Sequence, residues 1–474
     1  MAPSPSNSPA PPGAPARVSW MPLLAVCLGT FMLLVDVSVV NVALPPISRD
    51  LGASFSGLQW IVDAYALALA ALLLLVGAVS DVVGRKRTYI AGLVVFTLAS
   101  LACGLAPSEG ALIAARTVQG AGAAAMFATT IALLHGAYRG PALGTAFGIW
   151  GATNGAAAAA GPIVGGLLTE ALSWRWVFFV NVPIAIAAVV IARRTLGESR
   201  PAPDRSIDWA GGGAFTVAAA LATFALVRAD SVGWGSAQTL GCLAVALAAL
   251  LLFVAIERRV AAPLFDLGLL RSGPLGAVLL AGALYSAVAF GALVYASIWL
   301  QESKGLGPIG AGLAMLPLAA VAFVVAAGGG RRLHAWPSRL VLAAGLALIA
   351  LGNLLLAPLN GDSDWPSLLL GMAVCGLGVG AMSPTLASAA LAAVAPERSG
   401  MAAGALNTAR QLGLALGIAV LGNVYSSRVG SGHAAGSALG TTFLVAGIVG
   451  VIGVVLFLFT TSSHLVHKTA ATSP

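Results

Sequence analysis

The chain has 474 residues, of which 59% are hydrophobic and only 8% are charged, and its mean hydropathy is +0.96. A soluble protein of this size carries about a quarter charged residues, so the composition excludes a soluble fold. The net charge of +8 comes from Lys and Arg residues spread over short segments between apolar runs. That spread is typical of membrane topology and argues against a nucleic-acid partner.

Residues 1–20 are rich in Pro, Ser and Ala and are predicted to form a disordered cytoplasmic tail. Because about 20 apolar residues cross a bilayer, the rest of the chain predicts an all-α polytopic membrane protein with fourteen spans. The predicted spans are 22–44, 57–79, 88–107, 111–134, 143–168, 177–194, 208–228, 236–256, 274–299, 309–328, 339–358, 366–392, 401–424 and 438–462.

These spans divide into two groups of six with an extra pair between them. The predicted parts are a six-helix bundle at 21–194, a cytoplasmic linker at 195–207, two additional helices at 208–256, a second six-helix bundle at 257–462, and a cytoplasmic tail at 463–474. Placing both termini in the cytoplasm puts most of the 24 Lys and Arg residues on the cytoplasmic side, as the positive-inside rule favours.

Four charged residues lie well inside the apolar runs, namely Asp36, Asp63, Arg116 and Arg410. A charge at the centre of a span costs at least ~2.5–3.5 kcal/mol, so each is a candidate for function. Asp36, Asp63 and Arg116 fall at comparable depth in the outer half of the bilayer. Burial disfavours a charged carboxylate and a nearby arginine favours it, so a change in their separation would load or release a proton.

We therefore interpret Asp36, Asp63 and Arg116 as a proton-coupling group. A static Asp36–Arg116 ion pair that fixes helix packing is the alternative. Asp63 lies near a helix start, where an interfacial carboxylate is a further alternative.

Two glycine-containing segments have a physical interpretation of their own. In GAVSDVVGRKR (77–87), Gly77 permits close helix approach, Asp81 can pair with Arg85 or cap a neighbouring helix, and Gly84 allows a tight turn. In GATNGAAAAAGPIVGG (151–166), glycines spaced by four form a smooth packing face and a proline can bend the helix. The residues singled out in this second segment are Gly151, Gly155, Gly161, Pro162, Gly165 and Gly166.

Six segments in the expected order resemble the motifs of the 14-helix drug:proton antiporters of the major facilitator superfamily. They are LLVDVSVVNVALPPI (33–47), the loop at 77–87, ARTVQGAGAA (115–124), the segment at 151–166, WRWVFFVNVP (174–183) and GMAAGALNTARQLGLALG (400–417). The resemblance covers nearly the whole chain outside the tails. It implies a major facilitator fold, two six-helix bundles with two extra central helices.

The resemblance also implies roles for the motifs. Gly77, Asp81, Gly84 and Arg85 would latch the two halves in the outward-facing state. The fifth span would seal the pathway against leak, and Arg116 would take part in proton coupling with the first-helix acid. The matching loop of the second half, GGGRRLHAWPSR (328–339), lacks the acid, so the latch is predicted to be asymmetric.

Polar residues inside the spans predict a substrate cavity. Arg116 and Gln119 are one helical turn apart and can face the same cavity, and Arg410 and Gln411 lie in the middle of the thirteenth span, where structural hydrogen bonding is the alternative. The predicted cavity residues are Asn41, Gln119, Asn154, Asn407, Arg410 and Gln411.

The resulting prediction is a proton-coupled exporter of lipophilic drugs or antibiotics, cationic or neutral, that uses the proton gradient and no cofactor or metal. An enzyme is disfavoured because no metal cluster or nucleophile–base pair stands out. A primary pump is disfavoured because no phosphate-binding loop occurs. A dedicated exporter of one metabolite or self-made antibiotic, and a non-transporting membrane sensor or scaffold, are the alternatives. The excess of Arg over Lys suggests a bacterial plasma-membrane protein, predicted to be a monomer.

Overall fold

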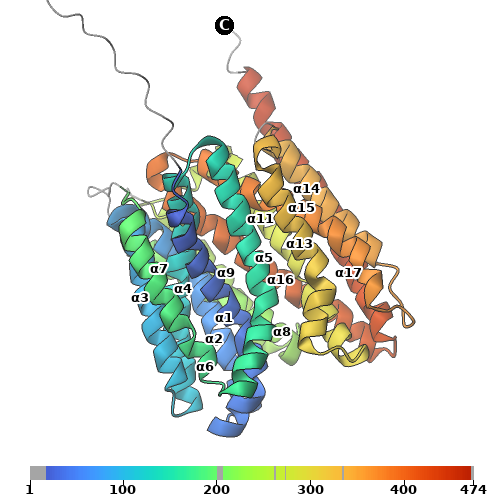
Figure 1. The fold of residues 1–474 in the computed structure, drawn as a ribbon. Coiled ribbons are helices and arrows are strands. Elements are labelled where there is room, and N and C mark those ends of the chain that lie inside the picture. The colour runs from blue at the N-terminus through green and yellow to red at the C-terminus, as the bar shows by residue number, and fades with distance from the viewer. Residues whose placement is uncertain (1–17, 200–206, 261–262, 273, 334–335, 471–474) are drawn as a thin grey trace, which may run out of the picture.

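The computed structural model describes residues 18–199, 207–260, 263–272, 274–333 and 336–470, and this part of the chain is helical with no strand (Figure 1). Twelve of its helices are long and apolar enough to cross a membrane. The predicted tail at 1–20 and the linker at 195–207 lie largely outside the described residues.

The N-terminal half is a bundle built from the first seven helices. They are α1 (Met21–Leu51), α2 (Phe55–Val83), α3 (Arg85–Gly104), α4 (Glu109–Ala137), α5 (Gly140–Ala171), the short α6 (Trp176–Phe179) and α7 (Asn181–Thr195). Helix α4 packs against α2 and α3, and α1 packs against α5 and α7. The predicted sixth span is thus α6 and α7 together.

The two additional helices form a hairpin of α8 (Trp209–Val232) and α9 (Ala237–Glu257). Each helix of the hairpin is capped at its N-terminus by a side chain. Asp208 accepts a hydrogen bond from the Gly211 amide at 2.8 Å, and Ser236 accepts one from the Thr239 amide at 3.1 Å. Helix α8 packs against α2 of the first half and α16 of the second. The hairpin therefore lies along the seam between the halves.

The C-terminal half repeats the arrangement. Its helices are α10 (Gly268–Ser272), α11 (Pro274–Phe290), α12 (Leu293–Ile298), a π-helical turn at Trp299–Ser303, α13 (Pro308–Leu333), α14 (Ser338–Leu356), a 3₁₀ turn at Trp365–Leu368, α15 (Leu369–Ala392), a second 3₁₀ turn at Pro396–Arg398, α16 (Ser399–Gly430) and α17 (Ala435–Ala470). Helix α15 packs against α13 and α14, and α11 packs against α16.

The halves meet along two helix pairs, α2 with α16 and α5 with α13. Figure 1 shows α5 and α13 side by side where the two halves join. We call the end of the bundle at the α2–α3 turn the Gly84 end and the opposite end, where α1 finishes, the Asp50 end. The start of α1 and the end of α17 lie at the same end of the molecule (Figure 1).

Candidate functional site

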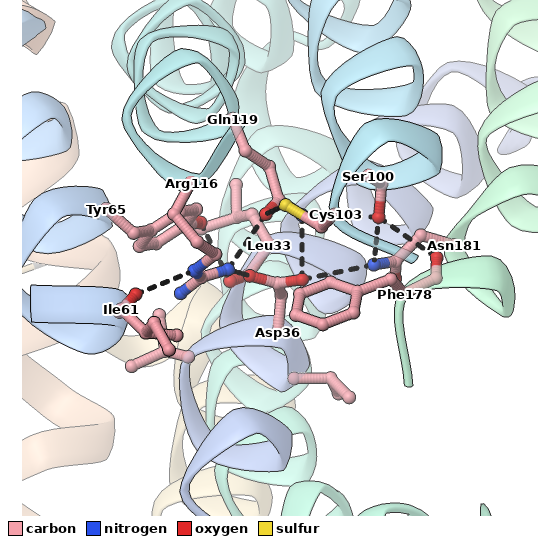
Figure 2. A network of polar contacts seen from close by, with 12 residues as sticks. Leu33, Asp36, Ile61, Tyr65, Ser100, Cys103, Arg116, Gln119, Phe178 and Asn181 are labelled. Atoms are coloured by element: carbon pink, nitrogen blue, oxygen red, sulfur yellow. Dashed lines mark hydrogen bonds and ion pairs between the residues drawn. The ribbon is translucent and has the colours of Figure 1, made fainter. Parts of the chain in front are cut away.

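The first candidate site is a polar cluster around Asp36, buried inside the N-terminal bundle (Figure 2). Asp36 comes from α1, Arg116 and Gln119 from α4, Ser100 from α3 and Asn181 from the start of α7. The side chains of Asp36 and Arg116 are 0% and 1% exposed. The structure thus brings together an acid and a base that lie 80 residues apart in the chain.

Three donors satisfy the Asp36 carboxylate. Arg116 Nη1 donates to Oδ2, while Gln119 Nε2 and Asn181 Nδ2 donate to Oδ1 at 2.8 and 3.1 Å. Ser100 completes the network, since its hydroxyl accepts from Asn181 at 3.0 Å and donates to the Phe178 carbonyl at 2.9 Å. A buried charge is tolerated where it is paired and hydrogen-bonded, as here.

Arg116 is held on every side. Its Nε donates to the Ile61 carbonyl at 3.1 Å and its Nη1 also donates to Gln119 Oε1 at 2.8 Å. The guanidinium carbon lies 4.2 Å from the centre of the Tyr65 ring, and the Tyr65 hydroxyl donates to the Leu33 carbonyl at 3.1 Å. Apolar residues of α1, α2, α4 and α6 surround the cluster. Loss of the Asp36 charge would leave this arginine as a buried, uncompensated cation.

Asp63 does not join this cluster, which differs from the predicted group of three charges. Ile61 and Tyr65, each two positions from Asp63 on α2, contact Arg116. Two positions along a helix are about 200° apart, so Asp63 faces the other way. It lines a groove of about 740 Å³ near the Asp50 end, shared with Asn41 and with Arg228 of α8. Asp63 is half-buried there, and Asn41 is exposed.

The second candidate site is a cavity of about 250 Å³ between the two halves. Residues of α1, α4 and α5 line it from one side, and residues of α11, α13, α15 and α16 line it from the other. Three predicted cavity residues, Asn154, Arg410 and Gln411, are in this lining. The other three are elsewhere: Asn41 is in the outer groove, Gln119 is in the Asp36 cluster, and Asn407 donates to the Phe127 carbonyl at 2.9 Å.

Helix α1 separates the two sites. Leu34 lines the central cavity, whereas Asp36, two positions later, is in the polar cluster. These positions are on opposite faces of the helix. The central cavity and the polar cluster therefore lie on opposite faces of α1.

The residues of the predicted latch join the two halves at the Gly84 end. Asp81 accepts hydrogen bonds from the Gly400 and Met401 amides at 2.7 and 2.8 Å, at the positive N-terminal end of α16. Arg85 donates to Asp81 at 2.9 Å and to the Pro396 carbonyl at 2.7 Å. Asp81 thus both pairs with Arg85 and caps α16.

Glycines allow this close approach. A side-chain carbon added at Gly77 would lie 2.6 Å from the Gly400 carbonyl oxygen. Gly84 has φ +112°, a conformation that favours glycine. Beside it, Glu198 accepts from the Lys86 and Arg87 amides at 3.1 Å and Ser199 accepts from the Arg85 amide at 3.1 Å. The sequence interpretation missed this cap on α3, although an acid and a serine after a span are a recognisable signal.

The glycines of α5 serve different neighbours. Gly161 and Gly165 face α1, where added carbons would meet Ser38 and Val39, and Gly151 faces Ser383 of α15. At Gly166 an added carbon would meet nothing within 4 Å. The surroundings of Gly155 and Pro162 lie outside the described residues. The predicted continuous packing face is therefore observed only for part of the set.

Several cluster residues were not singled out from the sequence. Asn181 lies in the segment WRWVFFVNVP, Ser100 and Cys103 lie in a span whose interior has no charged residue, and Tyr65 lies two positions after Asp63. Polar residues without charge give a weak signal in a membrane span. All four cysteines are free thiols; Cys103 and Cys375 are buried and Cys27 and Cys242 are half-buried.

Comparison with known proteins agrees with this architecture. Residues 26–418 and 336–473 match the family described as Major Facilitator Superfamily. The multidrug resistance protein Stp of Mycobacterium tuberculosis is 35% identical over 412 residues, which cover 87% of this chain and 76% of Stp. The cephamycin export protein CmcT of Amycolatopsis lactamdurans is 39% identical over 420 residues, which cover 85% of each chain.

A solved structure shows the same fold. The crystal structure of the human organic anion transporter MFSD10 (TETRAN) matches with a TM-score of 0.65, covering 92% of this chain and 100% of that one. Its sequence identity is 17%, so the similarity concerns the fold alone.

Proposed function

This chain belongs to the major facilitator superfamily, and from that premise we propose that it exports lipophilic drugs or antibiotics in exchange for protons by alternating access. It is a multi-pass membrane transporter, and its relatives include proteins named for multidrug resistance and for antibiotic export. Neither a cofactor nor a metal is part of the proposal, because the proton gradient supplies the energy.

The proposal includes the membrane topology. Helices α5 and α13 lie alongside the twelve candidate spans and would be two further spans, which makes fourteen. The Gly84 end, with Arg85, Lys86 and Arg87, would face the cytoplasm, together with both termini. The membrane would be the plasma membrane of a bacterium, and the working unit would be a monomer.

The observation that carries the proposal is the buried Asp36–Arg116 pair. A proton arriving at Asp36 would remove its charge and release Arg116, Gln119 and Asn181 from their shared acceptor. The packing of α1 against α4 and α7 would then change. Because α1 lines the cargo cavity with its other face, proton binding would move a wall of that cavity without touching the cargo.

The contacts at the Gly84 end support an outward-facing state. The hydrogen bonds of Asp81 and Arg85 to the start of α16 join the two halves at that end, and in the proposal they keep the cavity closed there. Breaking them is the step that would let cargo enter from the cytoplasm. In the proposal, the structure is one of the two states that alternating access requires.

The test is substrate-triggered proton release from acidified inside-out vesicles, followed with a pH-sensitive dye. Lipophilic cations, neutral antibiotics and organic acids are added in turn. The variants are Asp36→Asn and, as a matched control, Asp63→Asn, which makes the same chemical change outside the cluster. We expect substrate-dependent alkalinisation in the wild type, its loss in Asp36→Asn and its retention in Asp63→Asn.

Silence across the whole panel, with the protein shown to be in the membrane, would contradict proton-coupled drug export. Loss of the signal in Asp63→Asn as well would show that the outer groove takes part in coupling.

A dedicated exporter of one compound is the second candidate. The observation in its favour is the relative named as an exporter of cephamycin, one class of antibiotic. In the same vesicles, a response to a single compound would favour the dedicated exporter, and a response to many unrelated compounds would favour multidrug export.

A further inference from the structure

The charge on the wall of the central cavity is positive. Arg410 of α16 lines it, and none of the other residues that line it is charged in the described part of the chain. The nearest acid along α1, Asp36, is on the opposite face of that helix and already accepts from Arg116, Gln119 and Asn181. Arg410 is therefore an unneutralised cation in the cavity wall.

The packing of α16 against α11 determines the position of Arg410. Gly413 and Gly417 bring α16 against the backbone of α11 at Ala283 and Ala287. The arginine stem passes beside Gly282, where an added carbon would lie 3.5 Å from Arg410 Cγ. The guanidinium carbon lies 5.3 Å from the centre of the Tyr285 ring. The side chain is thus directed along α11 to the cavity.

The hydrogen-bonding capacity of Arg410 is unused among the described residues. Its Nε is buried and has no hydrogen-bond partner there. The Tyr285 ring does not neutralise the guanidinium charge, and it accepts no hydrogen bond from the five N–H groups in the guanidinium plane. A buried donor without a partner is costly, so this group is arranged for a partner that comes from outside.

The other residues that line the cavity indicate which further groups a bound molecule would have. Asn154 Oδ1 is a second buried atom without a partner among the described residues, and it accepts hydrogen bonds. Ser286, Ser383 and Gln411 add polar groups, while the remaining lining is mainly apolar and aromatic. The lining therefore suits a molecule with an acceptor group of negative charge, a hydrogen-bond donor and an apolar body.

We propose that this cavity binds amphipathic organic anions, with a carboxylate or similar acid group held by Arg410. The inference rests on the proposed export function and specifies its cargo. It differs from the sequence interpretation, which expects cationic or neutral cargo. A cation entering the cavity would meet Arg410 without an acid to compensate it.

Binding to the purified full-length protein in lipid nanodiscs tests the proposal by calorimetry. Three probes share one aromatic body: naphthylacetate, methyl naphthylacetate and naphthylmethyl-trimethylammonium. A hydrogen bond to a charged group corresponds to a preference of about ten- to hundredfold. We expect the wild type to bind the carboxylate more tightly than the ester by that factor, and the ammonium compound most weakly.

Arg410→Gln should bring the affinities for the acid and the ester together, and Arg410→Lys should retain part of the preference because it keeps the charge. Arg428→Gln is the matched control, since Arg428 is exposed at the far end of the same helix. It should leave the preference unchanged. If Arg410→Gln fails to fold, the order of the three probes on the wild type and Arg410→Lys decides.

Equal binding of acid and ester, or tightest binding of the ammonium compound, would overturn the proposal. So would an unchanged preference in Arg410→Gln, which is the result of a purely structural role. Proton-coupled flux in the vesicles separates this outcome from failure of the export function: cation-driven flux with no anion preference keeps antiport and removes the organic-anion cavity. Anion binding without proton-coupled flux keeps the cavity and removes antiport.

Discussion

At the scale of residues, the main feature is the complete pairing of Asp36 with Arg116. Each neutralises the charge of the other inside an apolar bundle, and Gln119, Asn181 and Ser100 form hydrogen bonds with the remaining polar atoms. Such a pair adds little net stability over apolar residues, but removing one partner is strongly destabilising. The pair is therefore stable as it stands and sensitive to the loss of either charge.

Because removing one partner of a buried pair costs more than removing both, the structure predicts the stability of Arg116→Gln. It leaves the Asp36 carboxylate buried without its cation, which should destabilise the protein by about 3–5 kcal/mol. The double variant Asp36→Asn/Arg116→Gln removes both charges and should recover much of that loss. The measurement is the apparent melting temperature of the purified protein in detergent. A double variant as unstable as the single one would contradict the mutual neutralisation of the pair.

The sequence was sufficient to predict a role for Asp36 and Arg116 together, but not to predict which residues surround them. A carboxylate and an arginine in apolar spans stand out because charges there are costly. Asp63 was grouped with them because it lies at a similar depth, but depth along a helix does not determine the direction of a side chain. Its opposite orientation follows from its position two residues from both Ile61 and Tyr65, once those residues are known to face Arg116.

At the scale of elements, the contact of α2 with α16 joins the two halves at the Gly84 end. Gly77 of α2 meets Gly400 and Gly404 of α16 at backbone distance, and four residues later Asp81 caps the start of α16. The close approach and the cap depend on each other, because the Asp81 side chain is short. Spreading the helices by the width of a methyl group would lengthen both amide hydrogen bonds.

A pair of alanine substitutions tests this dependence. Gly77→Ala places a carbon 2.6 Å from a backbone oxygen of Gly400, whereas Gly166→Ala meets nothing within 4 Å. We expect Gly77→Ala to open the Gly84 end and Gly166→Ala to leave it closed. Spin labels at Arg194 and Ser338, in a variant with the four native cysteines replaced, report the distance between the halves. A distance distribution in Gly77→Ala that matches the wild type would contradict the close-packing argument.

Helices themselves were predictable, and their interruptions were not. Long apolar runs locate most spans to within a few residues. The sixth predicted span is divided into α6 and α7 at Val180, and the ninth is divided after Phe290 and continued by α12. The ninth segment is apolar at its break and the sixth contains only Asn181 as a polar residue there, so hydropathy gives little sign of either break. The α8–α9 hairpin was predicted as an insertion, but its packing against α2 and α16 depends on tertiary contacts.

At the scale of the whole molecule, the charge of the cargo decides how much energy is available. With 100 mV inside negative and one pH unit, an entering proton supplies ~2.3 kcal/mol from the field and ~1.36 kcal/mol from the gradient. Expelling a monovalent cation uses ~2.3 kcal/mol of this sum, whereas expelling a monovalent anion adds the same amount. One-for-one exchange then provides ~1.4 kcal/mol for a cation and ~6 kcal/mol for an anion.

Exchange of one proton for one organic anion should therefore be electrogenic. In proteoliposomes with equal pH on both sides, a potassium-diffusion potential alone should drive naphthylacetate transport. The current should reverse when the potential is reversed, because two elementary charges move in the same sense per cycle. Flux that follows the pH gradient but ignores the potential would contradict this stoichiometry.

The two faces of α1 also bear on how such a transporter evolves. Leu34 belongs to the wall of the central cavity, and Asp36 belongs to the polar network on the opposite face. Substitutions in the cavity can therefore change which molecules are accepted while the energy-converting network stays intact. In the proposed exporter, single replacements in the cavity wall would therefore change the range of exported compounds without altering the Asp36 network.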